Sequence, residues 1–316
     1  SDGKYNSIFD LVKKVDLRAS NKKTLENLAL AGGFDSFKGT HRAQYFNPDG
    51  DGVIFLEKII RFGARYQENL NSAQTSLFGE SSDEVYQELV LPSTTEWQNL
   101  EQLKREKEVV GIYLSGHPLD DFKKEMLFFT NMQLDQLKDL KHLVNKKLNI
   151  AGIINEVEFF ETRNGKQWGK FILEDFSDQF EFRIFGEEFL KFRHFLNINQ
   201  FIRLKINIQE GWRNQETGRI GDPRIQFLSF EMLHDVINNN SNKITLQFDI
   251  RKLEAERILK LKKELNEFKG DKPIFFDIID SEKSLKLTLN SMKQKVVISS
   301  ELLNHLEDNE WLYKLN

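Results

Sequence analysis

The sequence contains no cysteine among its 316 residues. Disulfide bonds and cysteine-based zinc sites are therefore excluded, and the composition fits a reducing compartment. No run approaches the roughly 18 apolar residues that a transmembrane helix needs, so we expect no membrane span. The first residues, Ser1 to Lys4, show no apolar signal region and lead directly into a helical pattern. That beginning is what we expect of a chain cut from something longer.

The sequence also lacks a strongly basic segment. Its net charge is −4, made up of +2 over residues 1–73, −6 over 74–145 and zero over both 146–232 and 233–316. Bulk charge therefore does not favour nucleic-acid binding. Such a function would have to depend on where individual cations and aromatic rings are placed.

Sequence motifs for catalysis are missing as well. There is no P-loop, no GxSxG and no dinucleotide-binding glycine motif. Asp49-Gly50-Asp51 lies in a turn signal, not on the strand that a two-metal polymerase site needs, and it does not complete an EF-hand. His117 is followed by Asp120 and Asp121, but a helix stop and a new N-cap explain these residues better than acid–base chemistry. We therefore predict no catalytic residue, no metal site and no cofactor in this chain.

Hydrophobic periodicity predicts an α+β multidomain fold with four parts. Residues 1–73 form a helical region that resembles a helix-hairpin-helix, and residues 74–145 form a linker followed by helices. Residues 146–232 have the strand order of an OB-fold, a small Greek-key β-barrel. Residues 243–316 form a small α/β domain.

The expected helices and strands follow from the same patterns. Helices are expected over 8–15, from a cap at Asn21 to Gly32, over 53–69, over 95–114 with Thr94 or Thr95 as cap and Ser115-Gly116-His117-Pro118 as stop, and over 119–129. The five barrel strands are expected at 148–157, 168–174, 180–185, 201–208 and 224–230, with a helix over 186–196. Linkers are expected over 69–92 and 238–242. The last part should contain strands at 244–248, 273–279, 284–289 and 295–298, and helices at 253–268 and 300–307.

Cations and aromatic rings occupy all three regions through which an OB-fold contacts single-stranded nucleic acid. These are the second and third strands, the loop between strands one and two, and the loop between strands four and five. The candidate residues are Arg163, Lys166, Trp168, Lys170, Arg183, Phe185, Trp212, Arg213 and Arg219. Packing against a neighbouring domain would explain Trp168 and Phe185 equally well. The balanced charge predicts weak binding.

Two shorter segments are further candidates. Gln74-Thr75-Ser76-Leu77-Phe78 places an apolar pair in a polar linker, which is typical either of a docking peptide or of a local hydrophobic contact. The segment from Ser20 to Ser36 could present backbone N–H groups of its glycine turn to a phosphate of duplex DNA. An ordinary helical hairpin is the alternative. The residues of this second candidate are Lys22, Lys23, Gly32, Gly33 and Lys38.

Several strings together resemble the bacterial replicative DNA polymerase III alpha subunit, a C-family DNA polymerase. The resemblance covers almost the whole chain in order and is strongest in the segment around His117-Pro118-Leu119-Asp120. The strings are Glu106-Lys107-Glu108 with Tyr113 to Asp120, Asn21 to Leu28 with Ala31 to Asp35, Trp168 to Phe185, and Lys269 to Pro273. Gly32-Gly33 departs from the more usual Gly-Ala, and the first hairpin of the family's pair is missing, which puts duplex binding in doubt.

The resemblance implies a role in DNA replication for a cytoplasmic, nucleoid-associated replisome protein. Gln74, Leu77 and Phe78 would form the internal sliding-clamp motif, with Gln74 at the rim of the clamp pocket. The OB-fold would contact single-stranded template, and the last domain would bind the clamp-loader tau subunit. The parent protein would be a DNA-directed DNA polymerase, a nucleotidyltransferase using Mg²⁺, whose catalytic aspartates lie upstream of this chain. A stand-alone OB-fold protein that binds single-stranded nucleic acid remains the alternative.

Overall fold

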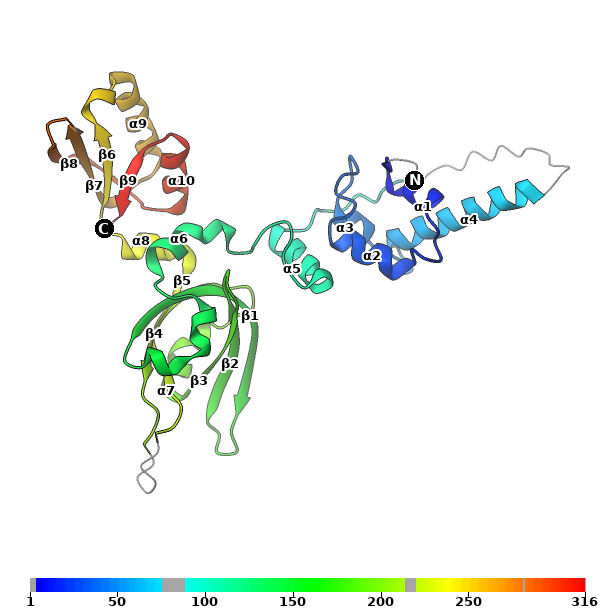
Figure 1. Cartoon of the computed structure of the whole chain (residues 1–316), viewed down its shortest axis with the longest axis horizontal. Coiled ribbons are helices and arrows are strands. Elements are labelled where there is room, and N and C mark those ends of the chain that lie inside the picture. Colours follow the sequence, from blue (N-terminus) through cyan, green and yellow to red (C-terminus); the bar gives the residue numbers. More distant parts are fainter. Residues whose placement is uncertain (1–3, 76–88, 214–219, 281, 316) are drawn as a thin grey trace. The chain divides into compact units, whose positions relative to one another are not determined.

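The computed structural model describes residues 4–75, 89–213, 220–280 and 282–315. The chain divides into two compact units, Ser1–Pro118 and Leu119–Asn316. The described part of the first unit is helical, and the second contains two β-sheets (Figure 1). The fold is thus mixed α+β, as the sequence predicts. None of the described helices is long and apolar enough to cross a membrane.

The first unit packs its helices around one apolar core that includes Leu25, Leu56 and Ile59. Asn21 caps the second helix by accepting a hydrogen bond from the Thr24 N–H at 3.1 Å, which confirms the predicted start. The helices are α1 (Ile8–Lys14), α2 (Lys22–Leu30), α3 (Arg42–Tyr45), α4 (Phe55–Thr75) and α5 (Asn99–Val110).

Two boundaries in this unit differ from the expectation. Helix α4 continues to Thr75, past the expected start of the linker, because no Gly or Pro interrupts the chain after Gly63. Helix α5 begins at Asn99 without a side-chain cap, so Thr94 and Thr95 do not cap it. It ends at Gly111, whose φ of +88° gives the left-handed C-cap that glycine adopts most easily. The expected stop at Ser115 lies beyond this end.

The first sheet of the second unit has five antiparallel strands in the order β3-β2-β1-β4-β5. A helix follows the third strand, so the predicted order of strands and helix is confirmed. Figure 1 shows α7 against this sheet. The elements are β1 (Lys147–Glu161), β2 (Gln167–Glu174), β3 (Gln179–Phe185), α7 (Gly186–Phe192), η4 (Arg193–Phe195), β4 (Phe201–Gln209) and β5 (Arg224–Met232).

The predicted barrel is not closed. Strands β3 and β5 are the two edges of the sheet, and no backbone ladder joins them among the described residues. Side chains fill the space between them instead, since the rings of Phe182 on β3 and Phe227 on β5 lie 5.9 Å apart in the same core. The sheet therefore wraps around one apolar core and leaves a seam between β3 and β5.

Strand β1 is long and bent because it belongs to both halves of this sheet. Its first half pairs with β4 as far as Ile153, and its second half pairs with β2. Gly152 marks the change of partner. A Cβ at this position would collide with the backbone of Glu174 at the end of β2, so the two strands can approach only because the residue is glycine.

The second sheet has the order β8-β7-β6-β9, with β6 and β7 parallel and the other pairs antiparallel. One continuous β8 replaces the two predicted strands, and β9 was not predicted. The predicted Asn-rich linker over 238–242 is confirmed only at its end: its first three residues belong to α8, where the Asn240 amide donates to the Glu231 carboxylate at 3.1 Å, and Ser241 and Asn242 connect α8 to β6. The elements are α8 (Val236–Asn240), β6 (Ile244–Asp249), η6 (Ile250–Lys252), α9 (Ala255–Glu267), β7 (Lys269–Asp280), β8 (Leu285–Val296), α10 (Ser300–Asp308) and β9 (Leu312–Leu315).

Residues 119–145 attach to both sheets. Leu134 and Leu137 are buried in the core of the first sheet. Glu125, on α6, accepts a hydrogen bond from the Ser300 hydroxyl at the start of α10. The elements of this segment are η1 (Asp120–Phe122), α6 (Lys123–Phe129), η2 (Leu134–Lys138) and η3 (Leu140–Leu143), and η5 (Leu233–Asp235) precedes α8.

Candidate nucleic-acid interface

The face of β1, β2 and β3 that points away from the core carries four of the predicted contact residues. In the β2–β3 register Trp168 lies opposite Phe185 and Lys170 lies opposite Arg183. The side chains that alternate with them, such as Phe171 and Phe182, are completely buried. The structure thus brings the two aromatic and the two basic candidates together on one face.

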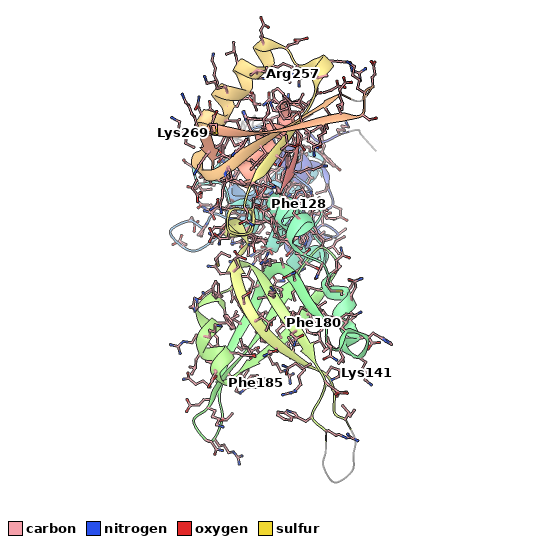
Figure 2. The ribbon with its side chains drawn as sticks, turned by 90° about the vertical axis from the view of Figure 1, so that its left-hand side faces the viewer. Phe128, Lys141, Phe180, Phe185, Arg257 and Lys269 are labelled. Carbon is pink, nitrogen blue, oxygen red and sulfur yellow. The ribbon has the colours of Figure 1, made fainter. Side chains whose placement is uncertain are left out.

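The aromatic row on this face contains a third ring. Phe160 on β1 lies opposite Trp168, and their rings stack with centroids 4.3 Å apart and an interplanar angle of 18°. The rings of Trp168 and Phe185 stack at 5.3 Å and 21°. Phe185 ends β3 and is 55% exposed (Figure 2). The sequence prediction missed Phe160 because it ended the first strand at Val157, where the alternation weakens, whereas pairing with β2 extends the strand to Glu161.

The neighbouring row on the same face carries compensated charges. Lys170 forms an ion pair with Glu158 on β1, and this hydrogen-bonded carboxylate raises the pKa of the lysine. The Arg183 guanidinium lies 2.7 Å from a carboxylate oxygen of Glu181. Both cations must therefore share their charge with a carboxylate when a phosphate approaches, which favours weak electrostatic binding.

The predicted loop residues lie on two hairpins. Arg163 and Lys166 belong to the exposed β1–β2 turn, where Gly165 has a φ of +72°. Neither takes part in an ion pair within the described chain. Trp212 is 75% exposed, and the Arg224 guanidinium lies 4.2 Å from the centre of its ring. The backbone of Arg213 forms an isolated antiparallel β-bridge with that of Ile220. Arg219 lies outside the described residues. The described parts of both hairpins project in the same direction (Figure 1).

Two hollows border the aromatic row. One, of about 380 Å³, lies between the end of β1 and the α7–η4 segment and is lined by Phe160, Phe159, Phe189, Arg193 and His194 among others. The other, of about 680 Å³, lies along the seam between β3 and β5 and is lined by Phe185, Arg183 and Arg224 among others. The two end rings of the row thus each face a hollow.

The glycine turn of the first unit uses its N–H groups internally. The Gly32 N–H donates to Ala29 O at 3.2 Å, and the Gly33 N–H donates to Leu28 O at 2.8 Å. Gly32 has a φ of +83°, and a Cβ there would collide with the Arg42 guanidinium. These two N–H groups are therefore not free to bind a phosphate in this conformation.

The lysines of the same candidate differ in their surroundings. The Lys22 ammonium lies 2.5 Å from a carboxylate oxygen of Glu57, and this hydrogen bond raises its pKa. Lys23 and Lys38 are exposed and form no ion pair within the part of the chain that the structure describes. They remain candidates for contact with a DNA backbone.

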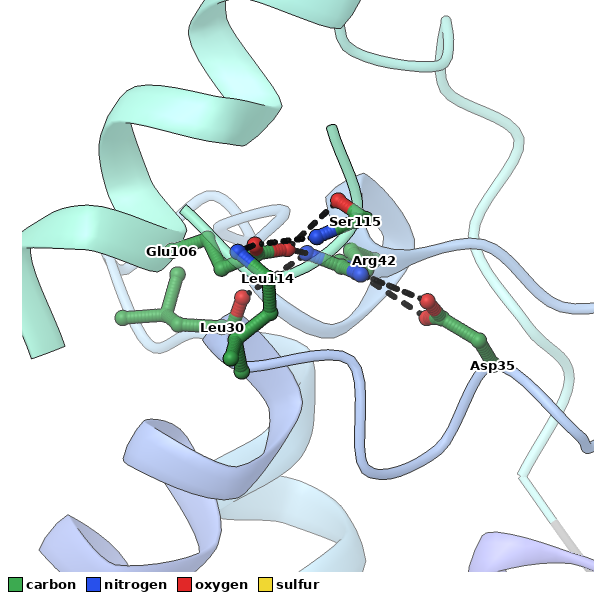
Figure 3. A network of polar contacts seen from close by, with 6 residues as sticks. All are labelled: Leu30, Asp35, Arg42, Glu106, Leu114 and Ser115. Carbon is green, nitrogen blue, oxygen red and sulfur yellow. Dashed lines mark hydrogen bonds and ion pairs between the residues drawn. The ribbon is translucent and has the colours of Figure 1, made fainter. Parts of the chain in front are cut away.

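A buried ion pair that the sequence did not predict joins α3 to α5. Arg42 is 4% exposed and Glu106 is fully buried, and the guanidinium donates to the Glu106 carboxylate at 3.1 Å (Figure 3). The guanidinium also donates to Asp35 at 2.6 Å. The Glu106 carboxylate further accepts hydrogen bonds from the N–H groups of Leu114 and Ser115 and from the Ser115 hydroxyl.

This network governs the charge state of Glu106. Burial opposes ionisation, but the hydrogen bonds from Ser115, Leu114 and Arg42 outweigh it and lower the pKa of the carboxyl. Residues 114 and 115, which belong to the segment that carries the family resemblance, are thereby fixed to α5. Structural anchoring thus explains the Glu106-to-Ser115 part of that segment.

The residues considered for acid–base chemistry have structural partners. The Lys123 ammonium lies 2.8 Å from an Asp120 carboxylate oxygen, and the ring of His117 contacts that of Tyr113 edge to face. Leu119 occupies the N-cap position of η1, so neither Asp120 nor Asp121 caps it as expected. No group of three or more His, Asp or Glu side chains capable of holding a metal occurs in the described ranges.

Most of the predicted clamp motif lies outside the residues that the structure describes. Leu77 and Phe78 lie outside the described residues, and Gln74 belongs to the last turn of α4. Its assignment therefore depends on the sequence alone.

Comparison with known proteins identifies relatives for both ends of the chain. Residues 244–316 match the family described as DNA polymerase III alpha subunit, C-terminal domain, and residues 1–45 match the helix-hairpin-helix motif. The DNA polymerase III subunit alpha of Borreliella burgdorferi is 29% identical over 99% of this chain and 26% of its own length. That of Pseudomonas aeruginosa is 25% identical over 97% of this chain and 26% of its own length.

The chain spans about a quarter of the length of these relatives. Among solved structures, a putative nucleic acid-binding lipoprotein from Klebsiella pneumoniae aligns over 34% of this chain and 85% of its own, with a TM-score of 0.21 and 13% identity. That similarity is too low to bear on the fold.

Proposed function

The chain belongs to the DNA polymerase III alpha-subunit family and matches its C-terminal region, and from this premise we propose that it is a non-catalytic attachment region of a replicative polymerase. Its first sheet serves as an OB-type domain that binds single-stranded template DNA. The observation that carries this proposal is the row of three stacked rings on the outer face of β1, β2 and β3.

The chemistry of that face suits single-stranded DNA better than a protein surface. Base–aromatic stacking tolerates any sequence, as a template-binding site requires. Cations flank the row on the β1–β2 turn at Arg163 and Lys166, and the adjacent row supplies Lys170 and Arg183. The paired glutamates Glu158 and Glu181 keep the electrostatic contribution small. A weak, sequence-independent contact is expected of a domain that must move along its template.

The test is the affinity of the chain for an oligothymidylate, measured by fluorescence anisotropy. Trp168→Ala combined with Arg183→Ala should weaken binding by at least roughly fivefold, because it removes a cation and the middle ring that holds Phe160 and Phe185 in the stacked row, and one lost base–aromatic contact costs about 1–3 kcal/mol. The affinity of the unaltered chain should fall as salt rises. Lys141→Ala, an exposed cation on η3, is the matched control. Equal affinities of the double variant and the unaltered chain would assign the face to domain packing.

A second attachment point is the sliding clamp, which we assign to Gln74, Leu77 and Phe78. The support is the QxxLF pattern itself and the family to which the chain belongs. Leu77 and Phe78 would fill an apolar pocket of the clamp, and Gln74 would donate or accept a hydrogen bond at its rim.

Leu77→Ala with Phe78→Ala should abolish binding of the chain to its clamp in surface plasmon resonance, because both apolar anchors are lost. Leu70→Ala with Leu89→Ala, which alters exposed leucines on either side of the motif, should leave binding unchanged. Clamp binding that survives the Leu77 and Phe78 changes would refute the assignment.

The remaining attachments are proposed because the chain belongs to this family. Residues 243–316 would bind the clamp-loader tau subunit, and the helix-hairpin-helix region would contact duplex DNA through Lys23 and Lys38. Nucleotide transfer, with Mg²⁺, would belong to the parent DNA-directed DNA polymerase and not to these residues. Several weak attachments acting together raise the effective concentration of the polymerase at its template and so support processive synthesis.

A further inference from the structure

The three rings on the outer face do not form a flat platform. Phe160, Trp168 and Phe185 are nearly parallel, and their centroids are 4.3 Å and 5.3 Å apart. Rings that lay side by side in one plane could not approach so closely, because their edge atoms would collide. The three rings therefore overlap face to face, as in offset stacking.

This arrangement leaves Trp168 with no free face. Phe160 covers one side of the indole and Phe185 covers the other, and Trp168 is accordingly half-buried. A nucleobase can stack only on a ring face that nothing else covers. Free faces therefore exist only at the two ends of the stack, on Phe160 and on Phe185.

The free face of Phe160 adjoins the hollow of about 380 Å³ at the end of β1. Pairing with β4 stops at Ile153, so β1 beyond this residue has no neighbouring strand on that side. Phe159 and Phe189, in edge-to-face contact at 5.5 Å, form another wall. Arg193 is exposed at the rim and has no ion-pair partner within the described ranges. Glu161 lines the hollow too, so the hollow combines an apolar slot with one cation and one carboxylate.

The free face of Phe185 adjoins the seam between β3 and β5. Because β3 is an edge strand, no neighbouring strand covers this side of the ring, and 55% of the residue is exposed. Arg183 and Arg224 line the same groove, and so do three carboxylates, those of Glu181, Glu187 and Glu188. Carboxylates thus outnumber the arginines in the seam and only balance the arginine in the hollow beside Phe160, so the seam should bind a nucleotide more weakly.

We infer that a single DNA strand places one nucleobase on Phe160 in the β1 hollow and another on Phe185 in the seam, with no base stacked on Trp168. The inference rests on the proposed binding of single-stranded DNA and adds two separate nucleobase sites to it. Neither Phe160 nor Arg193 was a predicted contact residue. The nucleotides between the two sites pass over the edges of the rings without stacking on them.

The experiment uses the full chain and first measures its affinity for oligothymidylates of increasing length. The shortest oligothymidylate that binds with full affinity is then used, so that the DNA strand binds in a single register. A single 2-aminopurine replaces thymine at each position in turn, because its fluorescence is quenched when it stacks. Two quenched positions separated by at least one bright position are expected. Phe160→Leu should restore fluorescence at one of them only, and Phe185→Leu at the other only.

The affinities of the same variants for the oligothymidylate are the second part of the test. Phe160→Leu and Phe185→Leu should each lower the affinity by roughly fivefold or more, with the larger loss for Phe160. Phe176→Leu, at an exposed phenylalanine in the β2–β3 turn, is the matched control and should have no effect. Unchanged unfolding temperatures confirm that the variants fold.

The outcomes separate the two proposals. A strand that binds with quenching at adjacent positions, or with affinity indifferent to Phe160 and Phe185, overturns the two-site inference and leaves single-strand binding intact. A chain that binds no oligothymidylate at all overturns both.

Discussion

At the scale of single residues, the recurring feature is that basic side chains pair with carboxylates. Lys170 and Arg183 on the candidate interface have carboxylate partners, and Arg42 in the first unit has two. The consequences differ with burial. An exposed pair contributes little to stability, whereas removing one partner of a buried pair leaves a charge without solvent or counter-ion.

Glu106→Gln should therefore destabilise the first unit markedly. The change removes the carboxylate that faces Arg42 and weakens the hydrogen bonds that fix residues 114 and 115, at a cost of about 3–5 kcal/mol. Urea unfolding measures the effect. Glu101→Gln on the same helix, whose partner Arg105 is exposed, should change stability by less than about 0.5 kcal/mol. Equal effects of the two changes would show that the buried pair is not needed.

The same carboxylate predicts a dependence on pH. Its pKa is lower in the folded chain than the ordinary value of 4.5, so the folded state binds a proton less readily than the unfolded state. The stability that Glu106 supplies is thus complete above this ordinary value and is lost as the pH falls through the folded pKa. The difference between Glu106→Gln and the unaltered chain should accordingly shrink as the pH falls below 4.5. A difference that stays constant down to pH 3 would contradict the assigned charge state.

At the scale of elements, alternating and helical periodicities predicted most strands and helices, because each has one buried face. The five strands of the first sheet and their intervening helix are the clearest case. Boundaries set by tertiary contacts were not predictable. Strand β1 extends to Glu161 because β2 pairs with it. Helix α8 forms in an Asn-rich segment because the Asn240 amide donates a hydrogen bond to the Glu231 carboxylate.

The candidate interface was predictable in part for the same reason. Alternation along β2 and β3 was enough to place Trp168, Lys170, Arg183 and Phe185 on one face. Phe160, Arg193 and the stacked geometry depend on register and on the α7–η4 segment, which no local pattern specifies. The open seam was also unpredictable, since closure of a barrel depends on how two distant strand edges meet.

Gly152 allows a test at this scale. Gly152→Ala should destabilise the second unit by about 1–3 kcal/mol, because the new Cβ would collide with the Glu174 carbonyl where β1 changes partner. Gly50→Ala, where a Cβ would meet nothing within 4 Å, is the matched control and should be nearly neutral. Thermal unfolding compares the two. A neutral Gly152→Ala would mean that β1 can bend without glycine at this position.

At the scale of the whole molecule, the proposed function is divided among attachment points and is not concentrated in one site. The net charge of −4 and the neutral balance over residues 146–232 argue against tight DNA binding by the chain alone. The proposed weak contacts to template, clamp and tau would become effective by acting together. Among the proposed attachment points, the first sheet is the one for which the structure supplies the most detailed geometry.

The most direct test of single-strand binding by this sheet is hydrogen–deuterium exchange of the whole chain with and without a saturating oligothymidylate. Slower exchange is expected in peptides that cover residues 156–170 and 181–195, which contain the three-ring row, the hollow beside Phe160 and the β3 side of the seam. Peptides of β6 to β9 should exchange as before. Binding of the oligothymidylate with protection confined to other parts of the chain would contradict the proposal.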